Sequence, residues 1–180
     1  MYRLVEFYTS GYVEADVVES VASSLRRALG LEVRLAGSLT IPDELLDSSR
    51  RQYLAEPIAR LVFNYKSEGA AGLLVADVDA YVPGLNFVFG LAVPRLGVAT
   101  IYLRRLRLWT DRTNYVERVV KEVLHELGHV FGLRHCGTRD CVMSFSNSVF
   151  EVDRKSRAFC RSCALKLGKL GIEVSAEFVI

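Results

Sequence analysis

The sequence predicts a mixed α/β (α+β) fold in which strand and helix patterns alternate along the chain. Residues 1–8 and 31–35 alternate apolar and polar side chains as strands do, and residues 13–29 between them carry apolar side chains at helical spacing. A β-α-β unit of this kind has parallel strands and a right-handed crossover. Residues 73–77 form a further apolar run that predicts a buried strand.

The length and composition favour one domain that spans residues 1–180. With 180 residues, of which 51% are hydrophobic, the chain can bury a sizeable core without a second domain. Lys and Arg number 23 against 21 Asp and Glu, so the net charge gives no general attraction to nucleic acid or anionic membranes. We see neither a signal-peptide pattern nor an apolar run of about 18 residues, so we expect a cytoplasmic protein that does not enter membranes. We also expect a monomer.

The remaining elements follow from apolar spacing and turn residues. We expect an exposed connection (36–50), a helix (51–65), two strands (86–91 and 98–103) and a final helix (152–170). Pro57 marks a kink or a late start of its helix. A long and largely buried helix should begin near Thr113, which is a reasonable N-cap.

All three histidines lie in one segment, His-Glu-Leu-Gly-His-Val-Phe-Gly-Leu-Arg-His, over residues 125–135. On a helix, His125 and His129 lie about one turn apart on the same face, so both imidazoles can bind one metal ion. Glu126 lies beside the first of them, where its carboxylate can reach a metal-bound water without binding the metal itself. The pattern predicts a catalytic metal site, and a chance cluster of ordinary helix histidines is the weaker alternative.

Gly132 explains how His135 can reach the same ion. If the helix continued, His135 would lie roughly 9 Å further along the axis than His129. A glycine can adopt the left-handed conformation that ends a helix, so the chain can turn back at Gly132. Three neutral nitrogen ligands and one open position, which holds water, are typical of a catalytic zinc site.

The four cysteines follow the histidines directly: Cys136, Cys141, Cys160 and Cys163. Cys-x4-Cys and Cys-x2-Cys spacings are typical of closed, structural zinc sites with four thiolates, so we expect two zinc ions per chain. Two disulfides are the competing interpretation, which the lack of a secretion signal disfavours. Cys136 could instead complete the first metal site, but a residue beside a ligand normally points away from the same ion.

The second zinc would connect the two parts of the domain. Residues 1–134 supply the sheet and its helices, and residues 135–180 form a zinc-stabilised C-terminal part. Cys160 and Cys163 share one face of the expected final helix, so the zinc would tie that helix to the loop after His135.

The segment from His125 to Cys163 resembles the archaemetzincins, a family of metzincin zinc peptidases. The match consists of the H-E-x-x-H-x-x-G-x-x-H signature, the four cysteines, and Met143 at the place of the methionine in the metzincin Met-turn. In metzincins this methionine lies beneath the catalytic zinc. That role is physically close to the role of a methionine that fills a gap in the core. Phe145 stands where some metzincins have a tyrosine, so no hydroxyl can assist the transition state from that position.

This resemblance implies a fold and an activity. Metzincins have a mostly parallel, twisted sheet with one antiparallel edge strand at the rim of the cleft, then a zinc-binding helix, a Met-turn and a C-terminal helix. We therefore expect a zinc-dependent metalloprotease with Glu126 as its general base and a peptide or protein substrate bound along the edge strand. The alternative is a non-catalytic, zinc-stabilised module that binds protein or nucleic acid, which would need neither Glu126 nor an open three-histidine site.

Two further charged groups have less specific interpretations. Asp77 and Asp79 follow a strand and could bind a metal, but acidic residues at strand ends usually hydrogen-bond a loop. Arg104, Arg105 and Arg107 could favour acidic substrates or nucleic acid, but a solvated basic turn is the favoured interpretation. We therefore expect no nucleic-acid partner.

Overall fold

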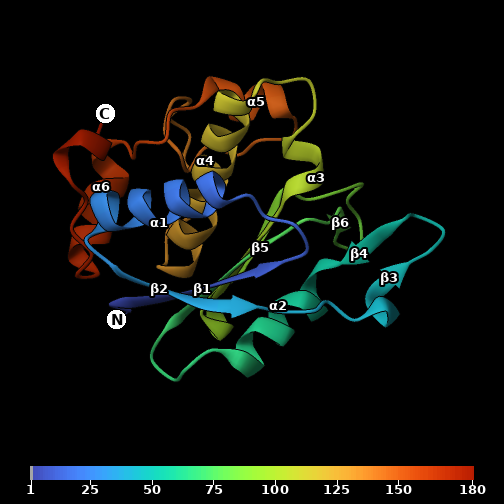
Figure 1. Cartoon of the computed structure of the whole chain (residues 1–180). Coiled ribbons are helices and arrows are strands. Elements are labelled where there is room, and N and C mark those ends of the chain that lie inside the picture. The colour runs from blue at the N-terminus through green and yellow to red at the C-terminus, as the bar shows by residue number, and fades with distance from the viewer. Residues whose placement is uncertain (1) are drawn as a thin grey trace.

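The computed structural model describes residues 2–180, which form two sheets and the helices around them (Figure 1). The larger sheet has the strand order β2-β1-β5-β8-β7. Its strands are β1 (Leu4–Ser10), β2 (Glu32–Ser38), β5 (Ala71–Ala76), β7 (Gly90–Val93) and β8 (Val98–Tyr102). All neighbours pair in parallel except β7, which is antiparallel to β8 at one edge. The predicted mixed α/β fold with a mostly parallel sheet is confirmed.

The other elements surround this sheet. The helices are α1 (Ala15–Leu29), α2 (Ala55–Tyr65), α3 (Leu103–Leu106), α4 (Arg112–Val130), α5 (Val149–Arg154) and α6 (Arg161–Lys169). A small second sheet contains β3 (Leu46–Asp47), β4 (Gln52–Leu54) and β6 (Ala80–Tyr81). Short 3-10 helices are η1 (Asp43–Leu45), η2 (Pro94–Leu96) and η3 (Ala176–Phe178).

Helices cover both faces of the large sheet because its interior strands are apolar on both sides. Successive side chains of a strand point to opposite faces. Phe7 and Leu73 join a buried cluster with α1 and α4, and their neighbours Tyr8 and Leu74 join a second cluster with α2. Figure 1 shows α1 and α4 on one side of the sheet and α2 on the other.

Several expected boundaries were wrong in the first two thirds of the chain. The strand expected over 86–91 begins only at Gly90, because Val88 first pairs with Ala80 of the small sheet. The helix expected over 51–65 starts at Ala55, because residues 52–54 form β4, so of the kink and the late start that Pro57 indicated, the late start is confirmed. The N-cap of α4 is Asp111 and not Thr113, since the Asp111 carboxylate accepts a hydrogen bond from the Asn114 N–H at 2.8 Å.

The final helix expected over 152–170 is also wrong, because the structure has two short helices there. Residues between α5 and α6 leave the helical conformation and pair with the C-terminal segment. Phe159 donates its N–H to Phe178 O at 2.8 Å and accepts from the Ile180 N–H at 2.9 Å. As a result, Cys160 is the N-cap residue of α6 and lies outside the helix that begins at Arg161.

Glu6 is a buried carboxylate that connects β1 to the neighbouring strand and to the loop before β5. It is 2% exposed, forms an ion pair with Arg34, and accepts hydrogen bonds from the Ser67 N–H (2.8 Å) and the Tyr8 hydroxyl (3.0 Å). Burial alone would raise the pKa of Glu6, but the hydrogen bonds outweigh it and lower the pKa to about 2. The ionised carboxylate therefore stabilises the fold above pH 4.5, and this stabilisation is lost as the pH falls toward 2.

Replacing Glu6 by Gln should remove this pH-dependent contribution. Between about pH 5 and 3, the free energy of unfolding of the parent should fall by about 2 kcal/mol more than that of Glu6→Gln. Urea unfolding at several pH values measures the difference. Glu173→Gln is an exposed control that should follow the parent. Equal pH slopes for the parent and Glu6→Gln would contradict this account.

Candidate functional site

Helix α4 buries one face in the core and turns another toward a cavity. Val119 and Leu127 are fully buried in the cluster shared with the sheet and α1, which fixes the helix axis. The helix residues that line the cavity are Glu122, His125, Glu126 and His129. The cavity has a volume of about 540 Å³, and its other walls come from residues 84–92, which include most of β7, from Pro94, Leu133 and His135, and from residues 145–147.

The end of α4 reverses the chain toward the same cavity. Gly132 has a φ of 99°, in the left-handed region that favours glycine. Its N–H donates to His129 O at 3.0 Å, and the Leu133 N–H donates to Gly128 O at 2.9 Å. These two bonds form a Schellman motif that satisfies the last carbonyls of the helix. The chain then returns so that His135 also lines the cavity.

The three histidines lie close enough to hold one ion. One ring nitrogen from each of His125, His129 and His135 lies within 4.8 Å of the other two. The Nε2 atoms of His125 and His129 are 3.1 Å apart. Tetrahedral bonds of roughly 2.05 Å to zinc would place two nitrogens about 3.3 Å apart, so this donor set fits the metal.

Backbone carbonyls orient two of the rings. His125 Nδ1 lies 2.8 Å from Val142 O, and His129 Nδ1 lies 2.9 Å from Leu133 O. If each Nδ1–H donates to its carbonyl, the Nε2 lone pairs are left for a metal. Burial lowers the pKa of all three histidines, most strongly that of His125. Low pKa values favour neutral imidazole, which is the form that binds metal.

Glu126 is buried beside the histidines, against strand β7. A Cβ atom at Gly90 would overlap the Glu126 side chain, so the absence of a side chain at Gly90 makes room for this carboxylate. Burial first, and then the charge of Glu122, raise the pKa of Glu126 to about 8. A bound cation would lower this pKa again, because it favours the ionised form.

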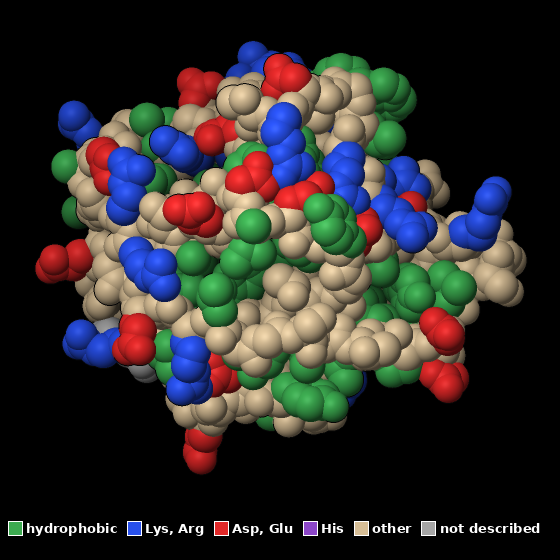
Figure 2. Space-filling view, in the orientation of Figure 1, with side chains coloured by type: hydrophobic (Ala, Val, Ile, Leu, Met, Phe, Trp, Pro, Cys, Tyr) green, Lys and Arg blue, Asp and Glu red, His purple; other side chains and the backbone are tan. Residues whose placement is uncertain are grey.

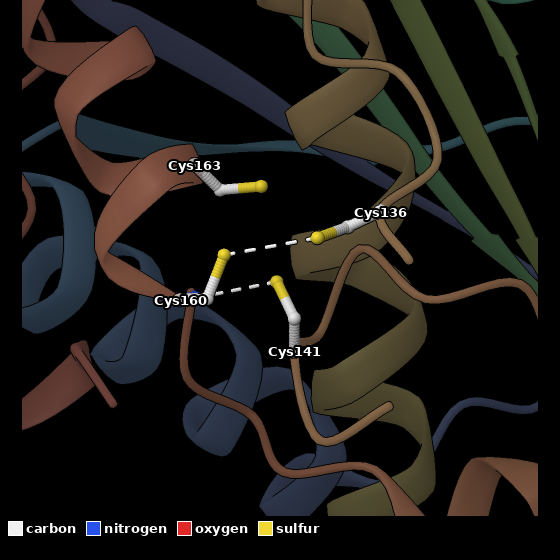
Figure 3. Close-up of side chains that lie close together, drawn as sticks. All are labelled: Cys136, Cys141, Cys160 and Cys163. Atoms are coloured by element: carbon white, nitrogen blue, oxygen red, sulfur yellow. Dashed lines mark hydrogen bonds between the residues drawn. The ribbon is translucent and has the colours of Figure 1, made fainter. Parts of the chain in front are cut away.

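The four cysteines form a second cluster, whose first member directly follows His135. Cys136 and Cys141 come from the loop after α4, and Cys160 and Cys163 come from the start of α6. Figure 3 shows the four sulfur atoms directed toward a common centre. All four Sγ atoms lie within 4.8 Å of one another, and those of Cys136 and Cys160 are 3.7 Å apart.

These distances fit a metal better than disulfides. Tetrahedral zinc with Zn–S bonds of about 2.3 Å places sulfurs about 3.8 Å apart, whereas a disulfide bond is about 2.05 Å long. All four cysteines are free thiols. Backbone N–H groups of Thr138 and Cys160 point at the sulfurs of Cys136 and Cys141, at 3.4 and 3.3 Å, which helps to stabilise thiolates.

Comparison with known proteins identifies the family. The sequence model of Peptidase family M54 matches residues 12–169. The chain is 45% identical to the archaemetzincin of Aeropyrum pernix over 159 residues, which cover 84% of this chain and 86% of that protein. It is 44% identical to the archaemetzincin of Pyrococcus abyssi, over 88% of this chain and 91% of that protein. The chain belongs to this peptidase family.

Solved archaemetzincin structures have the same fold. The crystal structure of the Methanopyrus kandleri archaemetzincin superimposes with a TM-score of 0.85 at 38% identity, covering 94% of this chain and 95% of that one. The Archaeoglobus fulgidus archaemetzincin, complexed with malonate, gives a TM-score of 0.80 at 39% identity, covering 91% and 99% of the two chains. The archaemetzincin family is a family of zinc-dependent metallopeptidases, so this chain is a zinc metallopeptidase.

Met143 packs directly against α4 in this archaemetzincin family member. It is fully buried, and a Cβ atom at Gly128 would overlap its sulfur. Its carbonyl accepts a hydrogen bond from the Cys136 N–H at 2.9 Å, which closes the loop that carries Cys141. Met143 therefore lies under the turn of α4 that joins His125 to His129.

Sequence reasoning missed a buried ion pair beside the first histidine. Lys155 Nζ lies 2.8 Å from Glu122 Oε1, 3.5 Å from His125 Nδ1 and 3.3 Å from Ser144 O. Glu122 gave a weak signal, because it is a carboxylate one turn before His125 on the face of the helix that carries the histidines. Lys155 gave none, because lysine is rarely buried and its partner is 33 positions away in the sequence.

Of the other charged groups singled out in the sequence, the two aspartates pair with Arg105 and Arg107, and Arg104 is exposed. Arg105 binds Asp79 through two hydrogen bonds of 2.8 Å, and Arg107 forms ion pairs with Asp77 and Glu14. Both aspartates therefore anchor arginines of the segment after β8. Figure 2 shows basic and acidic side chains interleaved on the face that it displays. In residues 2–180, no helix is long and apolar enough to cross a membrane.

The contact between Gly128 and Met143 predicts a coupled pair of substitutions. Gly128→Ala should lower the free energy of unfolding by about 1–3 kcal/mol, because the added methyl forces the Met143 side chain to move. In a protein that already carries Met143→Ala, Gly128→Ala should lower the free energy of unfolding by at least about 0.5 kcal/mol less. This difference is on the order of the coupling energies found between residues in contact. Urea unfolding of the four proteins measures the coupling. Additive effects would show that the two side chains do not touch.

Proposed function

We propose that this metallopeptidase holds its catalytic zinc with His125, His129 and His135 and uses Glu126 as the general base. The convergence of three histidine nitrogens and one buried carboxylate on a single cavity carries the proposal. When bound, zinc acts as a Lewis acid that polarises the scissile carbonyl and lowers the pKa of water.

The residues of the chain handle the protons. Glu126 accepts a proton from the attacking water and donates it to the leaving amine. The carbonyls of Val142 and Leu133 keep the rings of His125 and His129 in the tautomer that faces the cavity.

Strand β7 provides a binding edge for the peptide. Tyr102 donates its N–H to Phe89 O at 2.8 Å, so these two residues form a hydrogen-bonded pair. In an antiparallel ladder such pairs alternate with pairs that do not exchange backbone hydrogen bonds. Leu91 therefore also pairs with β8, and the main-chain groups of Gly90 and Ala92 point away from β8, where the Ala92 N–H is directed at the Glu126 carboxylate. An extended peptide can pair with these groups without any requirement for its side chains. Gly90 and Ala92 line the cavity, so the bound peptide would pass beside Glu126.

The four cysteines hold a second, structural zinc in this proposal, which gives two zinc ions per chain. Their sulfur spacing and their closed arrangement support it. Met143 forms the floor of the active site, in the manner of a Met-turn.

The single domain over residues 1–180, the monomeric state, the lack of a nucleic-acid partner and the cytoplasmic location stay predictions from the sequence. We find no observation that favours a non-catalytic binding module.

Substitution of Glu126 and of His129 should separate proton transfer from metal binding. Glu126→Gln should keep two zinc ions per chain but lose about 10²- to 10⁴-fold in kcat for peptide hydrolysis. His129→Ala should lose one zinc and the activity together, because it removes one of three ligands. Metal analysis and peptide turnover on the same samples test both. A Glu126→Gln protein that cleaves as fast as the parent, or that loses zinc, would refute the role of Glu126.

Replacing Cys160 by Ser should act on stability first. The variant should hold the second zinc more weakly and unfold at a lower temperature than the parent, because a structural zinc contributes directly to folding. Ser162→Ala, an exposed change in the same helix, is the control and should keep the parental midpoint. Unchanged thermal stability with selective loss of activity would instead assign the cysteine cluster to the chemistry.

A further inference from the structure

A second cavity, with a volume of about 500 Å³, lies beside strand β7. Its walls come from β7, the first turns of α2 and the segment after β6, and six of its side chains are apolar: Leu54, Pro57, Val82, Pro83, Leu91 and Val93. Of these six only Val93 is buried, so the other five present apolar surface to a group that enters. The proposed mechanism gives none of these side chains a role.

The second cavity and the histidine cavity lie on opposite faces of β7. Successive side chains of a strand point to opposite faces. Gly90 and Ala92 line the histidine cavity, and Ala92 packs with the cluster that contains α4. Val93 lines the second cavity and belongs to the cluster that contains α2, while Leu91 lines both cavities. The two cavities therefore meet at Leu91.

A peptide that pairs with β7 would place its own side chains in both cavities. Side chains that lie directly opposite each other on paired strands share one face of the sheet. A peptide residue opposite Ala92 therefore points toward the histidine cavity, and the next residue of the peptide points toward the second cavity. The second cavity is thus within reach of a residue close to the cleaved bond.

The charged side chains of the second cavity restrict which residue it can take. Arg60 and Arg95 both pair with Glu56, at 2.9 and 3.3 Å, and the three side chains are between 49% and 70% exposed. One positive charge is in excess, so a substrate lysine or arginine would be repelled and would also lose hydration against the apolar walls. A substrate carboxylate would compete with Glu56 for exposed arginines, where an ion pair contributes little. An apolar side chain avoids both costs.

We propose that the second cavity binds a large apolar side chain of the substrate, such as Leu, Met or Phe, at the position next to the residue that enters the histidine cavity. The inference rests on the proposed function, because it takes β7 as the edge along which the peptide binds. The backbone of β7 accepts any peptide sequence. Burial of apolar surface against Leu54, Val82 and Leu91 would add a preference at one position.

The test compares peptides in which one residue at a time, close to the cleaved bond, is Leu, Phe, Ala, Lys or Glu. At one position the parent should cleave the Leu peptide with a kcat/KM about tenfold or more above that of the Ala peptide, because the larger side chain fills the apolar cavity. The Lys and Glu peptides should be cleaved no better than the Ala peptide at that position.

Two substitutions should change this preference in opposite directions. Val82→Phe fills the cavity, so the Ala peptide should be cleaved at least as well as the Leu peptide. Leu54→Ala widens it, so the ratio of Phe to Leu cleavage should rise several-fold. Neither residue lines the histidine cavity. Leu45→Ala changes a half-buried leucine that lines neither cavity, and it is the control that should keep the parental preference. If Val82→Phe does not fold by circular dichroism, Leu54→Ala decides the question.

The charge of the second cavity gives an independent readout. Arg95→Glu turns one excess positive charge into one excess negative charge, so cleavage of the Lys peptide should rise several-fold relative to the Leu peptide. Arg104→Glu makes the same change of charge at an exposed residue that lines neither cavity, and it should leave the ratio unchanged. Equal effects of the two substitutions would contradict the assignment.

A binding measurement keeps this inference separate from the proposed function. In calorimetry, the Glu126→Gln protein with zinc bound should bind a peptide with Leu at alternate positions about tenfold more tightly than the same peptide with Ala there. Adding Val82→Phe should abolish the difference. This readout needs no cleavage, so a parent that cleaves no peptide would refute the proposed activity, while tighter binding of the Leu peptide would still support the inference. Equal affinities for Leu and Ala, tighter binding of Lys or Glu peptides, or a Leu preference that Val82→Phe and Leu54→Ala leave unchanged would overturn it.

Discussion

The packing of α4 against the sheet is the contact on which the rest of the structure depends. Consecutive residues of a helix are separated by about 100° around its axis. A helix shifted by one position would therefore bring Val123 and Leu127 into the places of Glu122 and Glu126 at the cavity, and the histidines would no longer point at one another. Val119, Val123 and Leu127 prevent this, because they are almost completely buried in the cluster with α1 and the sheet. The apolar core thus sets the direction in which the polar residues point.

The histidine cluster and the cysteine cluster are connected through one peptide bond. His135 belongs to the histidine cluster and Cys136, the next residue, belongs to the cysteine cluster. The loop from Cys136 to Met143 is closed by a hydrogen bond between their backbones, and Met143 packs back onto α4. Movement of the cysteine cluster would therefore move both His135 and Met143. The position of His135 is therefore coupled by geometry to the stability of the cysteine cluster.

The sequence predicted the parts of the fold that depend on short-range patterns. The spacing of His125, His129 and the glycine at 132 is set within one helix and its end, so local rules suffice. The start of β7 was missed because it depends on pairing with β8 and Ala80, which no local pattern reveals. The break between α5 and α6 was missed for the same reason, since Phe159 pairs with the chain end. The buried charge of Lys155 depends on a partner in another helix.

The shortness of β7 has a consequence for association between molecules. An unpaired strand edge can pair with a second copy of the protein as readily as with a peptide. Strand β7 has only four residues, and Pro94 follows it immediately in η2. Proline cannot donate a backbone hydrogen bond, and so short an edge offers few bonds to a folded neighbour. A flexible peptide can still reach into the cavity beside this edge, whereas a second sheet is too broad to do so. The edge can therefore stay open to peptides without promoting aggregation.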